Sequence, residues 1–279
     1  MSAEILRLKQ VNKIYNNQTH ALNDLSVSIN KGEFIVVIGP SGAGKSTFIR
    51  CINRMIDPNS GEIIFNDKHI ENLKGKELRK CRSQIGMIFQ NYNLVSRTNV
   101  IKNVLHGRLG YMKFIDSILG RYAKEDIMEA YKLLKQVGLE DQIYKRADEL
   151  SGGQMQRVGI CRAVIQNPKL LLADEPIASL DPSSATLIMD TLSTIVKDRE
   201  LTCIVNLHQI DFAKKYATRI IGIKEGQIVF DGKPECLDEK MISYIYKGRE
   251  EQMYLPEENL IPQTKATETP KFKLKEGLL

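Results

Sequence analysis

The sequence predicts an α/β fold in which helices cover both faces of a parallel sheet. Three continuous apolar runs indicate strands buried on both faces, and these are residues 34–39 (FIVVIG), 170–175 (LLLADE) and 203–208 (CIVNLH). Helical patterns lie between the runs, and this alternation is typical of doubly wound folds. A glycine-rich segment also joins the first run to a helical pattern.

Antiparallel strands are predicted near the start of the chain. Residues 6–11 (LRLKQV) and 25–29 (LSVSI) alternate apolar with polar side chains, which is the period of half-buried strands. Residues 62–65 (EIIF) add another short strand. We therefore expect an N-terminal antiparallel β subdomain in addition to the parallel sheet.

Helices dominate the middle of the chain. Residues from about 91 to 150 include KEDIMEAYKLLKQVGL (124–139) and lack a buried-strand run, which indicates an α-helical insert. Further on, Asp181 and Pro182 are typical of a helix start, and Ile188 and Leu192 would share one face of that helix. Residues 219–232 (RIIGIKEGQIVFDG) predict a hairpin that turns at Glu225 and Gly226.

These patterns divide the chain into three parts. The core is expected to be discontinuous, with residues 1–90 and 154–246, and residues 91–153 form the helical subdomain. From about residue 250 the chain is polar, interrupted by prolines and without periodicity. We expect the tail, residues 247–279, to be mobile or ordered only by a partner.

Composition excludes several classes of protein. Apolar residues are 42% and charged residues 27%, which is ordinary for a globular protein and unlike a disordered or fibrous one. The net charge of +6 is spread along the chain rather than clustered, so no nucleic-acid partner is expected. A solvated surface, an anionic ligand or an acidic membrane face explains this charge.

The five cysteines and four histidines are scattered, which predicts neither disulfides nor a zinc site. With no apolar run of about 18 to 20 residues and no signal-peptide core, a membrane-spanning part would have to come from another chain.

A phosphate-binding loop is the strongest local signal. Residues 39–47 (GPSGAGKST) fit the pattern GxxxxGK[ST] between a buried strand and a helix, which predicts a P-loop NTPase core of the RecA-like kind. Glycines let backbone N–H groups approach phosphate oxygens, and the start of the following helix favours an anion. Lys45 supplies a cation toward the β- and γ-phosphates, and the Ser46 hydroxyl is placed to bind Mg²⁺. The predicted ATP-binding residues of this loop are Gly39, Pro40, Ser41, Gly42, Ala43, Gly44, Lys45, Ser46 and Thr47.

Two acidic residues end the second apolar run. A nucleoside triphosphatase needs one carboxylate for the metal shell and a base that positions the attacking water. Asp174 is the candidate for the metal shell and Glu175 for the water. An acidic strand end is by itself more often a capped strand, but together with the phosphate loop the catalytic interpretation is favoured.

A second anion site is predicted at residues 150–157 (LSGGQMQR), which resemble the signature of ATP-binding-cassette (ABC) ATPases. Apolar residues continue from it at helical spacing, so Ser151 and the glycines lie at a helix start. The resemblance covers about residues 4–246. It implies a head-to-tail dimer in which the signature of one copy, residues Ser151, Gly152, Gly153 and Gln154, caps the γ-phosphate held by the other.

The resemblance also implies roles for scattered residues. Tyr15 would stack on adenine, Gln90 would sense the metal and the γ-phosphate, and His208 would contact the γ-phosphate. The catalytic set would be Glu175, His208, Gln90 and Lys45, the Mg²⁺ set Ser46, Gln90 and Asp174, and the dimer loop Ser179, Leu180 and Asp181. Without the resemblance, Tyr15 could be a surface aromatic, Gln90 a polar strand end and His208 a structural histidine. The chain departs from many relatives at Gln209, where they have Asp, and in a dimer loop that reads IASLD rather than TSGLD.

Within the family, three stretches are most similar to the ATPases of phosphonate importers, namely residues 29–54, 84–111 and 146–182. The middle stretch lies where importers of this family dock a coupling helix of the permease. The resemblance therefore implies an ATP-hydrolysing importer subunit for a phosphonate or related phosphorus oxyanion. It would lie at the cytoplasmic face of the cell membrane with two permease subunits and, indirectly, a solute-binding protein.

Alternatives to this function stay open. The chain could be the ATPase of another ABC importer, for phosphate, phosphite or a polar amino acid, or a non-transport ABC ATPase. DNA-repair ATPases need a long coiled coil, which is missing here, and translation-factor types carry two cassettes where this chain has one. A non-catalytic regulatory binder is disfavoured because Lys45, Asp174 and Glu175 are all present.

Overall fold

The computed structural model describes residues 3–16 and 18–247. Of these, residues 3–16 and 18–246 form one compact unit. The predicted tail therefore lies, except for Lys247, outside the described residues. None of the described helices is long and apolar enough to cross a membrane.

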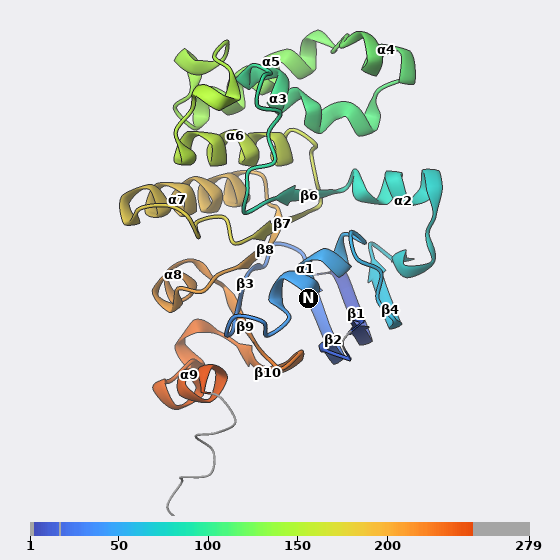
Figure 1. Cartoon of the computed structure of the whole chain (residues 1–279), viewed down its shortest axis with the longest axis vertical. Helices are drawn as coiled ribbons and strands as arrows, with labels where there is room; N and C mark the ends of the chain where they lie inside the picture. Colours follow the sequence, from blue (N-terminus) through green and yellow to red (C-terminus); the bar gives the residue numbers. More distant parts are fainter. Residues whose placement is uncertain (1–2, 17, 248–279) are drawn as a thin grey trace, which may run out of the picture. The chain divides into compact units, whose positions relative to one another are not determined.

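A six-stranded sheet forms the centre of the compact unit (Figure 1). Its strand order is β10-β9-β3-β8-β7-β6, in which β10 alone runs antiparallel, to β9. The strands are β3 (Phe34–Ile38), β6 (Ile85–Ile88), β7 (Leu170–Asp174), β8 (Thr202–Asn206), β9 (Arg219–Lys224) and β10 (Gln227–Gly232). All residues of β3, β7 and β8 are buried, so the predicted α/β fold with a parallel sheet is confirmed.

A second sheet is antiparallel and four-stranded, with the order β2-β1-β4-β5. Its strands are β1 (Glu4–Ile14), β2 (His20–Asn30), β4 (Ser60–Phe65) and β5 (Lys68–His69). Leu8 pairs with Val27 on one side and with Ile63 on the other, and all three are buried. The N-terminal antiparallel subdomain is thus confirmed, and it is longer than the sequence pattern indicated.

Two apolar cores lie on opposite faces of the parallel sheet. Ile35 and Val37 of β3 join the core that includes α1 (Lys45–Ile52) and the antiparallel sheet. Phe34 and Val36, which point the other way because side chains alternate along a strand, join the core of α6 (Gly152–Val164) and α7 (Pro182–Asp198). The phosphate loop therefore follows a strand that is fixed from both faces.

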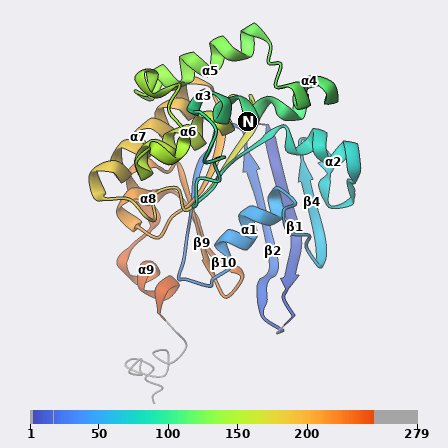
Figure 2. The ribbon, with the colours of Figure 1, turned by 45° about the horizontal axis from the view of Figure 1, so that its top comes forward.

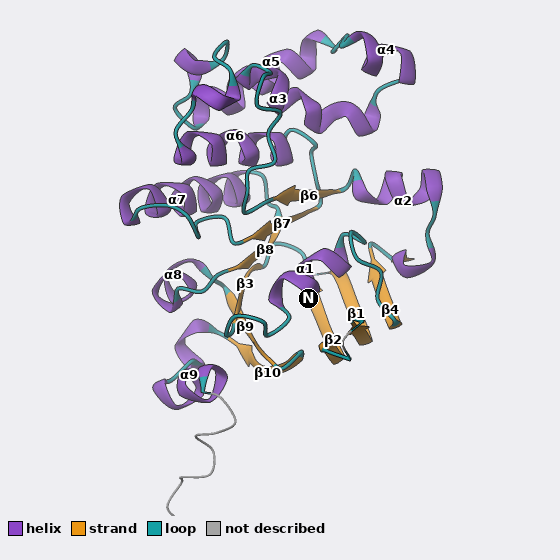
Figure 3. Ribbon diagram, in the orientation of Figure 1, coloured by secondary structure: helices purple, strands orange, loops and turns teal. Residues whose placement is uncertain are grey.

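The helical part lies between β6 and β7 in the chain (Figures 1 and 3). It comprises α3 (Val100–Leu105), η2 (His106–Tyr111), α4 (Phe114–Leu119), α5 (Lys124–Gln136), η3 (Glu140–Gln142), η4 (Ala147–Glu149) and α6. Buried residues of α3, α5 and α6 share one core with α7. Helix α6 runs without a break across residue 153, where the boundary of the helical subdomain is predicted, and the division into subdomains stays a prediction.

The remaining elements are short. They are η1 (Ile70–Asn72), α2 (Gly75–Arg82), α8 (Ile210–Tyr216), η5 (Pro234–Cys236) and α9 (Glu239–Tyr246). Figure 2 shows α1 between the antiparallel strands and the rest of the fold. The β9–β10 hairpin turns at Glu225 and Gly226 as predicted, and both have positive φ, 50° and 78°, as the tightest hairpin turns require.

Candidate functional site

The loop between β3 and α1 is held tightly against neighbouring strands. Gly39 has a φ of 149°, and a Cβ built there would lie 2.1 Å from the carbonyl oxygen of Ile223. Gly44 has a φ of 106°, and its Cβ would lie 2.1 Å from the carbonyl oxygen of Ala21. Only glycine fits at either position, so the loop can turn closely enough to point its N–H groups at an anion.

Lys45 extends over this loop. Its Nζ donates to the carbonyl oxygens of Gly39 at 2.8 Å and Pro40 at 3.0 Å, and the residue is 4% exposed. Burial lowers the pKa of Lys45, and the nearby carboxylates of Glu175 and Asp174 oppose that shift. The ammonium group is thus positioned where a phosphate bound by the loop would meet it.

Asp174 is the buried centre of a polar cluster. Ser46 Oγ donates to Asp174 Oδ1 at 2.8 Å, and Asn206 Nδ2 donates to the same oxygen at 3.0 Å. Arg50 binds the other carboxylate oxygen through Nε at 3.1 Å and a second guanidinium nitrogen at 3.0 Å. Asp174 is 2% exposed, and these donors together fix its carboxylate.

This cluster fits a Mg²⁺ ion. A hydroxyl oxygen and a carboxylate oxygen lie 2.8 Å apart at the end of the phosphate loop, and Mg²⁺ prefers such hard oxygen ligands together with water. Asn206 Oδ1 is buried and has no hydrogen-bond partner within the described part of the chain. An unpaired buried acceptor beside Ser46 and Asp174 is consistent with a polar group that is absent from the structure, such as a water of the Mg²⁺ shell.

Glu175 and His208 form a second polar pair next to the cluster. They follow β7 and β8, and His208 Nε2 lies 2.8 Å from Glu175 Oε1. Glu175 has a φ of 51°, an uncommon conformation for a residue other than glycine that is often found at functional sites. The pair lies where strand ends bring its side chains beside the phosphate loop.

A pocket of about 320 Å³ lies between Tyr15, the phosphate loop and the Glu175–His208 pair. It is lined by Tyr15, Thr19, Ala21, Ser41, Gly42, Gly44, Lys45, Ser46, Thr47, Glu175 and His208. The Tyr15 hydroxyl lies 3.4 Å from Thr47 Oγ1, so the predicted adenine-stacking residue borders the predicted phosphate site. Gln90 lies two residues beyond β6, is exposed, and does not line this pocket.

The signature residues begin α6. Ser151 Oγ accepts from the Gln154 backbone N–H at 3.3 Å, and Gln154 Oε1 accepts from the Ser151 N–H at 2.9 Å, which is a capping box. A Cβ on Gly152 would lie 2.8 Å from the Tyr92 hydroxyl. Ser151 is exposed, and none of residues 151–154 lines the nucleotide pocket of the same chain.

The predicted dimer loop lies next to the signature. Asp181 caps α7 by accepting from the N–H groups of Ser183 at 3.1 Å and Ser184 at 2.9 Å, and hydrogen bonds from these serines lower the pKa of Asp181. A Cβ on Gly152 would lie 3.4 Å from Leu180 Cδ2. Helices α6 and α7 therefore start close together, and Ser179 beside them is exposed.

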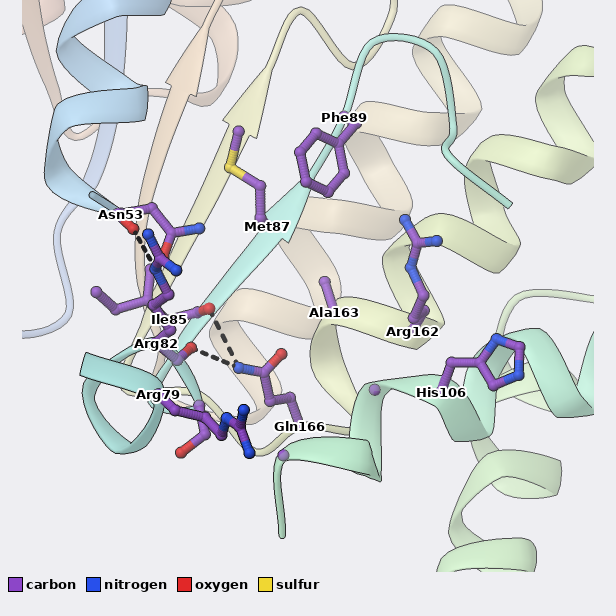
Figure 4. Close-up of a pocket in the computed structure, with 13 residues that line it drawn as sticks. Asn53, Arg79, Arg82, Ile85, Met87, Phe89, His106, Arg162, Ala163 and Gln166 are labelled. Carbon is purple, nitrogen blue, oxygen red and sulfur yellow. Dashed lines mark hydrogen bonds between the residues drawn. The ribbon is translucent and has the colours of Figure 1, made fainter. Parts of the chain in front are cut away.

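A second pocket, of about 300 Å³, lies between β6 and the helical part (Figure 4). Apolar side chains of β6 and Phe89 line it together with three arginines and Gln166, whose amide donates to the carbonyl oxygens of Arg82 and Ile85. His106 also lines it, and burial followed by the charges of Arg162 and Lys102 lowers the pKa of His106. Residues 84–111, the stretch expected at a permease contact, supply much of the lining.

Two residues of the site, Arg50 and Asn206, are not among those predicted from the sequence. Arg50 lies in the second turn of the helix after the phosphate loop, and Asn206 ends the apolar run of β8. A polar residue in a buried strand was the available signal for Asn206. For Arg50 there was none, because an arginine on a helix is ordinarily a surface residue.

Comparisons with known proteins agree with this site. The ABC transporter family profile matches residues 22–178. The chain is 54% identical to phosphonates import ATP-binding protein PhnC 2 of Halalkalibacterium halodurans, over 87% of this chain and 100% of that protein. It is 50% identical to phosphonates import ATP-binding protein PhnC of Treponema denticola, over 85% of this chain and 93% of that protein.

Solved structures show the same fold. A dimeric ATP-binding cassette in a post-hydrolysis state bound to ADP and Pi matches with a TM-score of 0.72 and 33% identity, over 82% of this chain and 99% of that chain. The protein cbiO1 of Clostridium perfringens, part of the ABC transporter complex cbiONQ, matches with a TM-score of 0.74 and 32% identity, over 91% of this chain and 96% of that chain.

Proposed function

Because the chain belongs to the ABC transporter family, we propose that it is the ATPase that powers import of a phosphonate or related phosphorus oxyanion through a separate permease. The observation that carries the ATPase part is the pocket that joins Lys45, Ser46, Glu175 and His208. Relatives named for phosphonate import, at 50% and 54% identity, support the solute class.

The pocket residues suit hydrolysis of a nucleoside triphosphate. Lys45 would exchange its two backbone carbonyl partners for β- and γ-phosphate oxygens. Ser46 and Asp174 would hold Mg²⁺, which supplies positive charge to the phosphate oxygens when bound. Glu175 would orient the attacking water and accept its proton, and His208 would hold the Glu175 carboxylate and contact the γ-phosphate.

The site is proposed to be completed by a second copy of the chain. A helix start such as that of α6 favours an anion, yet residues 151–154 do not line the pocket of their own chain. A similar cassette has been solved as a dimer with ADP and Pi. In a head-to-tail dimer, Ser151 of one copy would face the γ-phosphate held by Lys45 of the other.

The pocket in Figure 4 is the proposed contact with the permease. Arg162 lines this pocket and also donates to the backbone carbonyl oxygen of Tyr92 at 2.8 Å. Tyr92 lies two residues after Gln90, and Arg162 lies on α6, the helix that the signature begins. A permease helix in this pocket would therefore act on the Gln90 segment and on the signature helix together.

The proposal is tested by reconstitution into liposomes with a candidate permease and its solute-binding protein. We expect the binding protein loaded with a phosphonate to stimulate ATP hydrolysis by the assembly, in which this chain would lie at the cytoplasmic face. Phosphate, phosphite and a polar amino acid are the comparison solutes. Stimulation by phosphate or phosphite alone would replace phosphonate as the solute within this class, stimulation by the amino acid alone would overturn the class, and hydrolysis that no solute or permease changes would overturn the import role.

A further inference from the structure

Helix α4 carries its apolar side chains on the outside. Phe114, Ile115, Ile118 and Leu119 are exposed to 78%, 69%, 67% and 54%. Their spacing places them along one stripe of the helix, because residues four apart share a face. Asp116, between them in the sequence, is less exposed than any of the four.

This pattern is the reverse of what a globular protein normally shows. A surface helix usually packs its apolar stripe on the core and turns polar residues to water. A contiguous exposed apolar patch therefore indicates a surface that meets a partner. Leu109 and Tyr111, exposed to 41% and 48%, are further exposed apolar side chains in the preceding η2, and Gly107 and Gly110 of the same η2 line the proposed permease pocket.

Basic residues border the stripe at both of its ends. Lys113 precedes α4, and Arg121 and Lys124 follow it, and all three are exposed. Glu125 is the exposed acidic residue of this border. Among the ion pairs found in residues 3–16 and 18–247, none involves Lys113, Arg121 or Lys124, so these cations are available to an external anion.

We propose that α4 is a membrane-surface contact, in which the apolar stripe enters the headgroup region of the bilayer and the three basic residues meet anionic lipid phosphates. An apolar stripe with basic flanks is the pattern of helices that lie in this interface. Long basic side chains can keep their charges at the headgroups while apolar neighbours go deeper.

Lipid is a better match than a protein groove for this surface. Helix α4 has six residues and is therefore about 9 Å long. The face of so short a helix is much smaller than the area of about 800 Å² that each partner buries in a stable protein interface. Four apolar side chains and three cations suffice for a weak and reversible membrane contact. The inference rests on the proposed function in one respect only, that a permease brings this chain to the membrane.

Tryptophan fluorescence offers a direct test, because the full chain contains no tryptophan. The variant Phe114→Trp places the single reporter on the stripe. The matched control is Tyr144→Trp, since Tyr144 is exposed to 79% but lies outside α4. With vesicles of phosphatidylglycerol, we expect the emission of the Phe114→Trp variant to shift to shorter wavelength and to be quenched by brominated acyl chains, while the emission of the control stays unchanged.

The basic border is tested in the same assay. In the Phe114→Trp background, Lys113→Gln, Arg121→Gln and Lys124→Gln together should weaken vesicle binding about a hundredfold, because each cation near an anionic surface contributes about fivefold. In the same background, the double variant with Ile118→Ser and Leu119→Ser should abolish the emission shift, because it removes half of the apolar stripe. ATP binding by every variant shows that its fold is retained, since these side chains lie outside the core.

Three results would overturn the inference. These are no emission shift of the Phe114→Trp variant with anionic vesicles, an equal shift of the Tyr144→Trp control, or protection of the introduced indole only when purified permease is added in detergent. The last result would assign the stripe to the permease. Because the vesicles contain no permease and the readout is not ATP turnover, the outcome is independent of whether phosphonate stimulates hydrolysis.

Discussion

Glu175 is the residue on which the proposed chemistry depends most. Its backbone lies in the left-handed region with φ of 51°, and its carboxylate is 2.8 Å from His208 Nε2. Such a conformation costs energy for a residue with a side chain, and it persists only where surrounding structure imposes it. Glu175 directly follows Asp174, which pairs with Asn206 where β7 and β8 end side by side at the nucleotide pocket.

The variant Glu175→Gln should bind ATP normally and hydrolyse it about 10²–10⁴-fold more slowly. An amide keeps the shape of the side chain and a hydrogen bond to His208, but it no longer accepts a proton from water. Calorimetry with ATP and a phosphate-release assay measure the two effects separately. Wild-type turnover in this variant would remove Glu175 from the proposed mechanism.

Asn206 is proposed as a positioning residue for the metal. Its amide nitrogen donates to Asp174 Oδ1 at 3.0 Å and to Ser46 Oγ at 3.3 Å, so it fixes both proposed metal-binding side chains. Asn206→Leu keeps the branched shape of the side chain, at a larger volume, and removes these bonds. We expect the Mg²⁺ concentration for half-maximal ATP binding to rise about 10- to 100-fold, as for lost outer-shell partners of metals.

The control for Asn206 lies on the same strand. Thr202→Val changes a buried residue at the far end of β8, whose hydroxyl accepts from the Gly32 N–H at 3.0 Å. It should leave the Mg²⁺ dependence unchanged. If Asn206→Leu weakened ATP binding equally with and without Mg²⁺, its role would be structural rather than metal-directed.

At the scale of residues, contiguous motifs were predictable and distant partners were not. Lys45, Ser46, Asp174 and Glu175 stand in local patterns whose chemistry requires them. Asn206 reaches Asp174 only because β7 and β8 pair in a register that no local pattern specifies.

At the scale of elements, the start of η2 and the end of α6 approach each other closely. A Cβ built on Gly107 would lie 2.1 Å from the backbone carbonyl oxygen of Arg162. The backbone of Gly107 does not have positive φ, so the requirement for glycine there is steric. This contact joins two of the elements that line the proposed permease pocket.

Gly107→Ala should therefore lower the free energy of unfolding by about 1–3 kcal/mol, because the added methyl group forces α6 and η2 apart. Chemical denaturation measures the change. The matched control is Gly110→Ala in the same segment, whose Cβ would meet only the Ser83 Cβ at 3.4 Å. Equal stability of the two variants would show that the η2–α6 contact can relax without cost.

Long elements with clear periodicity were predictable, and short ones were not. The buried strands and the start of α7 at Asp181 follow from their patterns. Helices α2 and α8 have eight and seven residues, which is too little for a periodic signal. For α4, the pattern indicated a helix in this region but not which face meets the solvent, because that depends on packing.

At the scale of the whole molecule, the two proposed anion-binding places lie on separate elements. The phosphate loop follows β3, which is fixed between two cores, and the signature begins α6 in the helical part. Residues 151–154 do not line the nucleotide pocket of their own chain, so in the proposed mechanism neither place alone would enclose a triphosphate. A dimer in which each copy supplies one place to the other would use both.

Mixed dimers distinguish this arrangement from a site formed within one chain. Lys45→Ala removes the phosphate cation of one copy, and Ser151→Arg blocks the exposed signature of the other, so each variant alone should be inactive. If sites form between copies, a mixed dimer pairs the intact phosphate loop of the Ser151→Arg chain with the intact signature of the Lys45→Ala chain. Mixing the two inactive proteins should then restore ATP hydrolysis, in proportion to the mixed dimers that form. If each site belonged to one chain, every site in the mixture would carry one of the two defects, and activity would stay absent at every mixing ratio.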